Sequence, residues 1–169
     1  MCNYEKLLND ANMIGLKVFE LNFESDAKGL CYGEKIGIKK DMTSNEKACI
    51  LAEEIGHFKK TVGNILDQSI VGNKKQEKIA RTWAVNKMIH IDDLFSINLN
   101  CCNTSYDIAE ALGVTEEFLQ EILETFKRKY GLIYHKNGKT IIFHDTTFSI
   151  ATDNKKNPPS CANRKEDYI

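Results

Sequence analysis

The segment from Thr43 to Phe58 constrains the fold most, because it combines a helix start with a long apolar face. Thr43 and Glu46 form a capping box, in which each side chain satisfies a free backbone N–H in the first turn. Apolar residues then recur at helical spacing, which predicts a helix from about residue 44 to residue 60. Its expected buried face consists of Ala48, Leu51, Ala52, Ile55 and Phe58.

This helix contains the charged motif Glu53-Glu54-Ile55-Gly56-His57. The motif matches the His-Glu-x-x-His signature of zinc proteases except at the first place, where Glu53 replaces His. Residues four apart lie one turn above each other, so Glu53 and His57 can hold one ion together. Glu54 would then face a metal-bound water as general base. Burying unpaired carboxylates is costly, which favours a metal site over a solvated charged face.

A third metal ligand is expected on a second helix, predicted over residues 74–89. Three protein ligands leave one position of a catalytic metal ion open for water. Glu77 follows His57 after nineteen intervening residues, and the small Ala80 and Ala84 would let the two helices approach closely. The apolar residues at helical spacing here are Ile79, Ala80, Trp83, Ala84 and Met88.

The loop between these two helices is predicted to run through Asp67 and Gly72. Asp67 is a candidate additional or substitute metal ligand. A turn-forming Asp is the alternative interpretation of the same residue.

The segments on either side predict a small antiparallel sheet and a separate C-terminal module. A short helix is expected over residues 4–14, a strand over 18–23, and a strand, turn and strand over 29–39. Further local signals are a capping box at Thr104 and Asp107, a helix stop at Gly113, a helix cap at Thr115, and a type I′ turn at Asn137-Gly138 within a hairpin over 132–143. Helix, turn, helix and hairpin is a winged-helix-like order. The predicted division is 1–103, 104–150 and a tail over 151–169 that is expected to be disordered.

Three segments of the chain resemble the ImmA/IrrE family of metallopeptidases, which occur on phages and integrative elements. The segments are Cys49–Phe58, Thr61–Ile65 and Asn73–Ala84, with a weaker likeness at Tyr106–Glu110 and Val114–Leu119. The resemblance spans roughly residues 20–145 and implies an α+β fold with a minimal zincin-like core. It also implies cleavage of a repressor with a helix-turn-helix domain, with Glu54 as general base and with His57 and Glu77 as metal ligands.

Glu53 departs from the usual ligand pattern, although family members from phage-like elements often have Glu at this place. With Glu53, His57 and Glu77 the ligand set carries two negative charges rather than one. The metal would then be a weaker Lewis acid, and its bound water would be harder to ionise. Zinc is the favoured ion, and manganese is the alternative because carboxylate-rich sites also accept harder ions.

Charge discriminates between this function and a DNA-binding regulator. Residues 104–150 contain five Lys or Arg against seven Asp or Glu, whereas DNA affinity depends on neutralising phosphates. The helix that would read bases carries Glu116, Glu117, Glu121 and Glu124. Direct DNA binding is therefore disfavoured, and a protein substrate is favoured. A catalytically inactive metal-binding or protein-binding regulator stays open as a third interpretation.

Composition indicates an ordinary globular chain in the cytoplasm. The 169 residues carry a formal net charge of −1 and are 42% hydrophobic. No uninterrupted apolar stretch approaches the roughly 18 residues of a membrane-spanning helix, and the N-terminus lacks a secretory signal. The six cysteines include no Cys-x-x-Cys spacing, so free thiols are expected.

Overall fold

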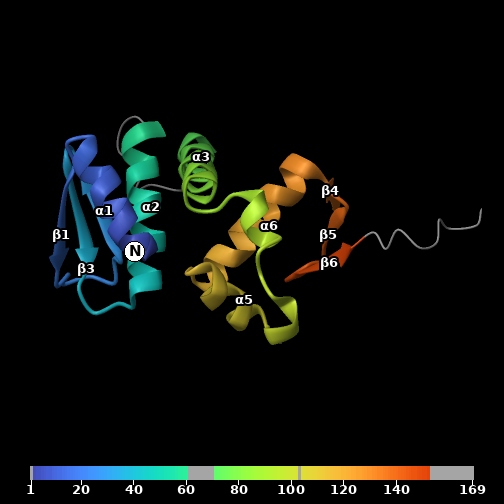
Figure 1. The fold of residues 1–169 in the computed structure, drawn as a ribbon. Coiled ribbons are helices and arrows are strands. Elements are labelled where there is room, and N and C mark those ends of the chain that lie inside the picture. Colours follow the sequence, from blue (N-terminus) through green and yellow to red (C-terminus); the bar gives the residue numbers. More distant parts are fainter. Residues whose placement is uncertain (1, 61–70, 103, 153–169) are drawn as a thin grey trace, which may run out of the picture.

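A computed structural model describes residues 2–60, 71–102 and 104–152. They form an α+β structure in which helices lie between two small sheets (Figure 1). The elements in chain order are α1 (Asn3–Met13), β1 (Lys17–Leu21), β2 (Gly29–Tyr32), β3 (Lys35–Lys39), α2 (Ser44–Lys60), α3 (Val71–Met88), α4 (Ile91–Leu94), the 3-10 helix η1 (Leu99–Cys101), α5 (Ser105–Leu112), α6 (Glu116–Tyr130), β4 (Ile133–Lys136), β5 (Lys139–Phe143) and β6 (Phe148–Thr152).

The first sheet is mixed, so the expectation of an antiparallel sheet was wrong. Its strand order is β1-β3-β2, and β1 pairs with β3 in parallel, with Val18 opposite Ile36. The chain crosses from β1 to the far edge, and a tight turn at Gly33 (φ 58°) then returns β3 to the middle. Only β2 and β3 are joined by a hairpin, because the parallel pair needs the longer connection.

Helices α1 and α2 pack against this sheet, and α2 has the bounds that the sequence predicts. The capping box is confirmed: the Thr43 N–H donates to Glu46 Oε2 at 2.8 Å, and the Glu46 N–H donates to Thr43 Oγ1 at 3.3 Å. Phe58 does not belong to the buried face, because its side chain is 40% exposed. The apolar face of α2 therefore ends one turn earlier than expected.

Helix α3 starts at Val71, so Gly72 lies in the helix and not in the preceding loop as expected. Ala80 and Ala84 are fully buried, whereas Ile79 is 40% exposed. The expected stripe on this helix was therefore too wide. Its small residues face the core, and Ile79 does not.

The C-terminal half follows the predicted order of helix, helix and hairpin. Thr104 and Asp107 form the expected capping box, Gly113 ends α5 in a left-handed conformation, and Thr115 caps α6. Asn137 and Gly138 both have positive φ between β4 and β5, as the type I′ turn requires. Strand β6 was not expected. It pairs with β5 and includes Ala151 and Thr152, which were assigned to the disordered tail.

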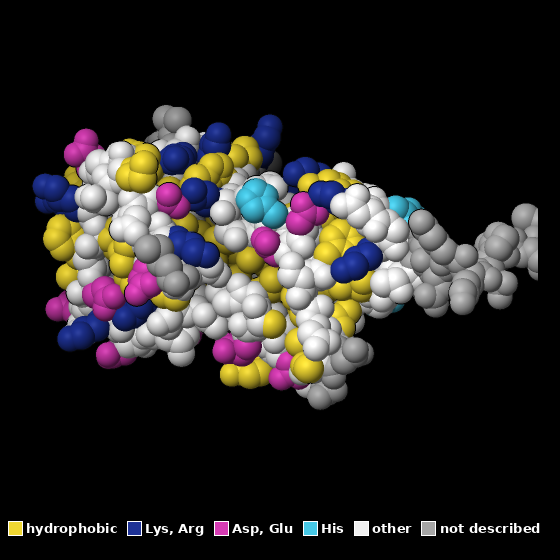
Figure 2. Space-filling model, in the orientation of Figure 1, with side chains coloured by type: hydrophobic (Ala, Val, Ile, Leu, Met, Phe, Trp, Pro, Cys, Tyr) yellow, Lys and Arg dark blue, Asp and Glu magenta, His cyan; other side chains and the backbone are white. Residues whose placement is uncertain are grey.

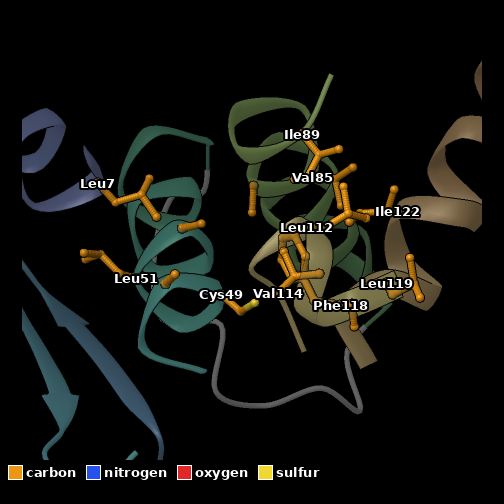
Figure 3. Close-up of a cluster of buried hydrophobic side chains, with 14 of the residues drawn as sticks. Leu7, Cys49, Leu51, Val85, Ile89, Leu112, Val114, Phe118, Leu119 and Ile122 are labelled. Carbon is orange, nitrogen blue, oxygen red and sulfur yellow. The ribbon is translucent and has the colours of Figure 1, made fainter. Parts of the chain in front are cut away.

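Buried side chains form one cluster that runs through both predicted modules. It includes Leu7 on α1, Leu51 on α2, Val85 on α3 and Leu119 on α6 (Figure 3). Leu51, Val85 and Leu119 have no exposed surface. The division at residue 103 stays a prediction, and the cluster indicates that the two parts stabilise each other.

No helix in the described ranges is both long enough and apolar enough to cross a bilayer. The cysteines in those ranges, which exclude Cys161, are all free.

Leu119→Ala should destabilise the N-terminal part as well as α6, because the buried cluster is shared. Removing a fully buried Leu side chain costs about 2–5 kcal/mol of the free energy of unfolding. Trp83, the single tryptophan, lies on α3 and reports the unfolding of that helix by its fluorescence. The midpoint of the Trp83 fluorescence transition should lie at a lower urea concentration in Leu119→Ala than in the wild type. Ile133→Ala, at a side chain 54% exposed, is the control, and an unmoved Trp83 transition would contradict a shared core.

Candidate functional site

The backbones of α2 and α3 come into contact at Gly56 and Ala80. A Cβ atom built on Gly56 would lie 2.6 Å from the Ala80 carbonyl oxygen, which is closer than real Cβ atoms come to their neighbours. Only glycine therefore fits here without a shift of one helix. The close packing expected from Ala80 and Ala84 is present, and Gly56 is a contributor that the periodic pattern did not single out. As a result, side chains next to Gly56 on α2 lie close to side chains of α3 near Ala80.

His57 and Glu77 meet across this contact. His57 Nε2 lies 3.3 Å from Glu77 Oε2, and both side chains are largely buried. Metal–ligand bonds of about 2.0–2.2 Å at tetrahedral angles put two donor atoms roughly 3.3–3.5 Å apart. The observed separation therefore suits both an ion pair and two ligands of one metal ion.

The two side chains also shift each other's protonation. Burial acts to lower the pKa of His57, but the hydrogen bond and charge of Glu77 outweigh it and raise that pKa. The hydrogen bond from His57 in turn lowers the pKa of Glu77, against the effect of its burial. Glu77 is therefore held as a carboxylate, which is the form that binds cations.

Glu53 lies one turn before His57 on the same face of α2. Burial raises its pKa, and the charges of Glu77 and Glu121 act in the same direction. Arg81 is its strongest favourable neighbour, ahead of His57. A cation close to this face would remove the cost of holding Glu53 ionised.

The side chain of Glu54 lies between its own helix, α2, and strand β2. Burial raises its pKa to about 7, with Glu53 and Glu77 adding to the effect, while His57 and the N–H of Cys31 act against it. A carboxyl that titrates near neutrality is suited to accept and return a proton.

Gly29 on β2 makes room for the Glu54 carboxyl. A Cβ atom at Gly29 would lie 2.7 Å from Glu54 Oε1 and 2.4 Å from Ile50 Cγ2. The sequence pattern did not identify Gly29 as part of the site. A glycine in a predicted strand was the available signal, because it often marks a close approach of the backbone.

Arg81 is a second residue that the sequence pattern did not identify. Its Nε donates to Glu77 Oε1 at 2.9 Å, and a terminal nitrogen donates to Glu121 Oε1 on α6, also at 2.9 Å. The spacing of Glu77 and Arg81, four residues apart on one helix, was a signal for the first contact. Nothing local in the sequence indicates the second.

A cavity of about 340 Å³ lies beside these residues, between α2, α3 and α6. Glu53, Arg81 and Glu121 line it together with apolar side chains that include Ile50 and Phe118. The candidate metal-binding face of α2 is therefore next to an open space.

The structure thus brings His57 and Glu77 together and places Glu53 and Glu54 beside them. Among the residues it describes, no three His, Cys, Asp or Glu side chains form a ready metal cluster. Asp67 lies outside the described residues. The donor types and the separation of His57 and Glu77 fit a metal ion, whereas the third ligand expected from the sequence, Glu53, lies on the same helix face without completing such a cluster.

The family model of the IrrE N-terminal-like domain, Peptidase_M78, matches residues 11–124. The chain belongs to this family. The match includes α2 with the motif Glu53–His57 and α3 with Glu77, and it ends within α6 before the C-terminal sheet. Membership identifies a peptidase-type domain of the metallopeptidase class and confirms the resemblance found in the sequence. No curated protein and no solved structure matches the chain.

Gly56→Ala should separate α2 from α3. The added methyl group meets a backbone oxygen that cannot move aside, and overpacking of this kind costs about 1–3 kcal/mol of the free energy of unfolding. This loss should exceed the gain in helix propensity of Ala over Gly. Urea denaturation measures it, with Lys60→Ala at an exposed position of the same helix as control. A Gly56→Ala protein as stable as the wild type would contradict the close helix contact.

Proposed function

We propose that this chain is a metal-dependent endopeptidase. The observation that carries the proposal is the approach of His57 Nε2 to Glu77 Oε2 across α2 and α3, within a domain of the Peptidase_M78 family. His57 and Glu77 would hold the ion, with Glu53 as the third ligand expected from the helix spacing. When bound, the ion supplies a Lewis acid that polarises the carbonyl of the scissile peptide bond.

Glu54 acts as the general base. Its carboxyl takes a proton from the attacking water and returns it to the leaving amine, for which its pKa of about 7 is suited. Strand β2, which lies against Glu54, is an edge strand of the first sheet. An extended peptide that pairs with this edge would run past the Glu54 carboxyl.

Zinc is the ion we favour, with manganese as the alternative. Two carboxylate ligands make the site harder than one with two histidines, and harder sites accept manganese. Arg81 offsets part of the additional negative charge, because it interacts with both Glu53 and Glu77.

The substrate we propose is a repressor with a helix-turn-helix domain, encoded by a phage or mobile element and cleaved in the cytoplasm. Helices α5 and α6 with strands β4–β6 support a winged-helix-like module. The start of α6 carries Glu116 and Glu117, and on the face drawn in Figure 2 Lys and Arg side chains are interspersed with Asp and Glu. These charges favour docking of a protein over binding of DNA by this module. The second candidate function is an inactive metal-binding regulator, which Glu53 in place of His would favour.

Metal analysis tests the binding site. Purified wild-type protein should retain about one equivalent of zinc after dialysis, since three protein ligands hold an ion tightly. His57→Ala and Glu77→Ala should each retain far less, while His144→Ala, at an exposed histidine between β5 and β6, should match the wild type. Equal retention by the wild type and the two ligand variants, for zinc and for manganese, would contradict the metal site.

Glu54→Gln tests catalysis separately from metal binding. The amide cannot accept the proton, so cleavage should fall by roughly 10²–10⁴-fold while the metal is retained. Mass spectrometry of new termini in a peptide library, digested by zinc-loaded protein, measures the rate. Glu124→Gln, at an exposed position of α6, is the matched control. New termini produced equally by wild type and Glu54→Gln would exclude Glu54 as the base, and none from the wild type would favour the inactive regulator.

A further inference from the structure

We propose that Arg81 is a positioning residue that holds Glu77 in place for the metal ion and connects it to Glu121 on α6. The proposal rests on the metal site proposed above and assigns it a further part. Helix α6 thereby becomes a support of the metal site, although it contributes no ligand.

The two oxygens of the Glu77 carboxylate have different partners. Oε1 accepts the hydrogen bond from Arg81 Nε at 2.9 Å, and Oε2 lies 3.3 Å from His57 Nε2. Arg81 therefore occupies the oxygen that a metal ion held between His57 and Glu77 would not need. A hydrogen bond to the remote oxygen of a ligating carboxylate fixes its orientation, as partners of metal ligands commonly do.

Arg81 is itself fixed by Glu121. The guanidinium is planar and rigid, so donation to Glu121 Oε1 at 2.9 Å through another nitrogen determines the direction of Nε. The side chain of Glu121 is 33% exposed and that of Glu77 is 21% exposed. Arg81, whose own side chain is 41% exposed, thus bridges two partly covered carboxylates from different helices.

The carboxylates around Arg81 explain why a positively charged side chain lies at this position. Its guanidinium interacts with the carboxylates of Glu53, Glu77 and Glu121. Glu53 adds a negative charge at the place where the zinc-protease signature has a neutral His. Arg81 reduces the repulsion among these carboxylates, and its geometry keeps it beside the ligands without taking the place of the ion.

Zinc affinity, measured by competition with a chromophoric chelator, tests the proposal. Arg81→Met should bind zinc about 10–100-fold more weakly, as expected when a group that orients a ligand is lost. Arg81→Lys should also lose about tenfold, because an ammonium group retains the charge but not the rigid fork between the two carboxylates. Lys87→Met is the matched control, because Lys87 on α3 forms an ion pair with Asp10 away from the site and should bind zinc like the wild type.

Glu121→Gln tests the connection to α6. It should weaken zinc binding by about two- to fivefold, the effect of one partly exposed ion pair. In the Arg81→Met background the same change should have no further effect, because Glu121 acts through Arg81. With Co²⁺ in place of zinc, the visible absorption should change in Arg81→Met and not in Lys87→Met, a difference that loss of stability alone would not produce.

Several outcomes would overturn the proposal. Zinc affinity of Arg81→Met equal to or greater than that of the wild type excludes positioning, and wild-type affinity of Arg81→Lys reduces the role of Arg81 to its charge. Additive effects of Arg81→Met and Glu121→Gln exclude the connection through Arg81. Zinc binding by the wild type no stronger than by His57→Ala would overturn the proposed function, and this inference with it. If His57→Ala binds zinc more weakly than the wild type but Arg81→Met does not, only the role of Arg81 is overturned.

Discussion

The contact between Gly56 and Ala80 is the constraint on which the rest of the site depends. Two helices that carried ordinary side chains here would be held apart, and the residues beside the contact would not meet. Because Gly56 has no Cβ, His57 is brought opposite Glu77 within 3.3 Å. The same approach brings Arg81, one turn beyond Glu77, towards the carboxylate of Glu53. A single backbone contact thus sets the separation of the proposed ligands.

That approach also concentrates negative charge in a partly buried place. Glu53, Glu54 and Glu77 lie on two neighbouring helices, and the pKa values of Glu53 and Glu54 are raised mainly by burial. Carboxylates held together in this way repel each other and favour the arrival of protons or of a metal ion. Arg81 and His57 relieve part of that repulsion in the free protein.

The sequence could predict those parts of the fold that depend on local chemistry. The capping boxes at Thr43 and Thr104 and the turn at Asn137-Gly138 were found where predicted, because a few neighbouring residues determine each of them. The parallel pairing of β1 with β3 was missed, since strand order depends on how a connection crosses the sheet and not on alternation within a strand. Phe58 and Ile79 were misplaced because helical periodicity shows a face but not how far the neighbouring element extends along it.

The candidate site was predictable to the same extent. The spacing of Glu53 and His57 on one helix indicates candidate metal ligands, with Glu54 as the candidate base. Glu77 was expected as the third ligand because it lies on the second helix, where small residues allow a close approach. Gly29 and Glu121 were missed because their relevance exists only after β2 and α6 are packed against α2 and α3. Long-range contacts of single side chains leave no periodic signal in a sequence. The residues that support the candidate site are therefore harder to predict than its candidate ligands.

The position of Glu121 bears on the role of the C-terminal module. An acidic helix binds DNA poorly, so the acidic residues of α6 first served as an argument against DNA binding. In the structure one of those acidic residues faces inward and accepts a hydrogen bond from Arg81, beside a cavity that Glu53 also lines. The negative charge of α6 is thus partly directed at the proposed metal site rather than at a partner. Helix α6, which begins the predicted C-terminal module together with α5, therefore also forms part of the wall of the cavity beside the proposed site.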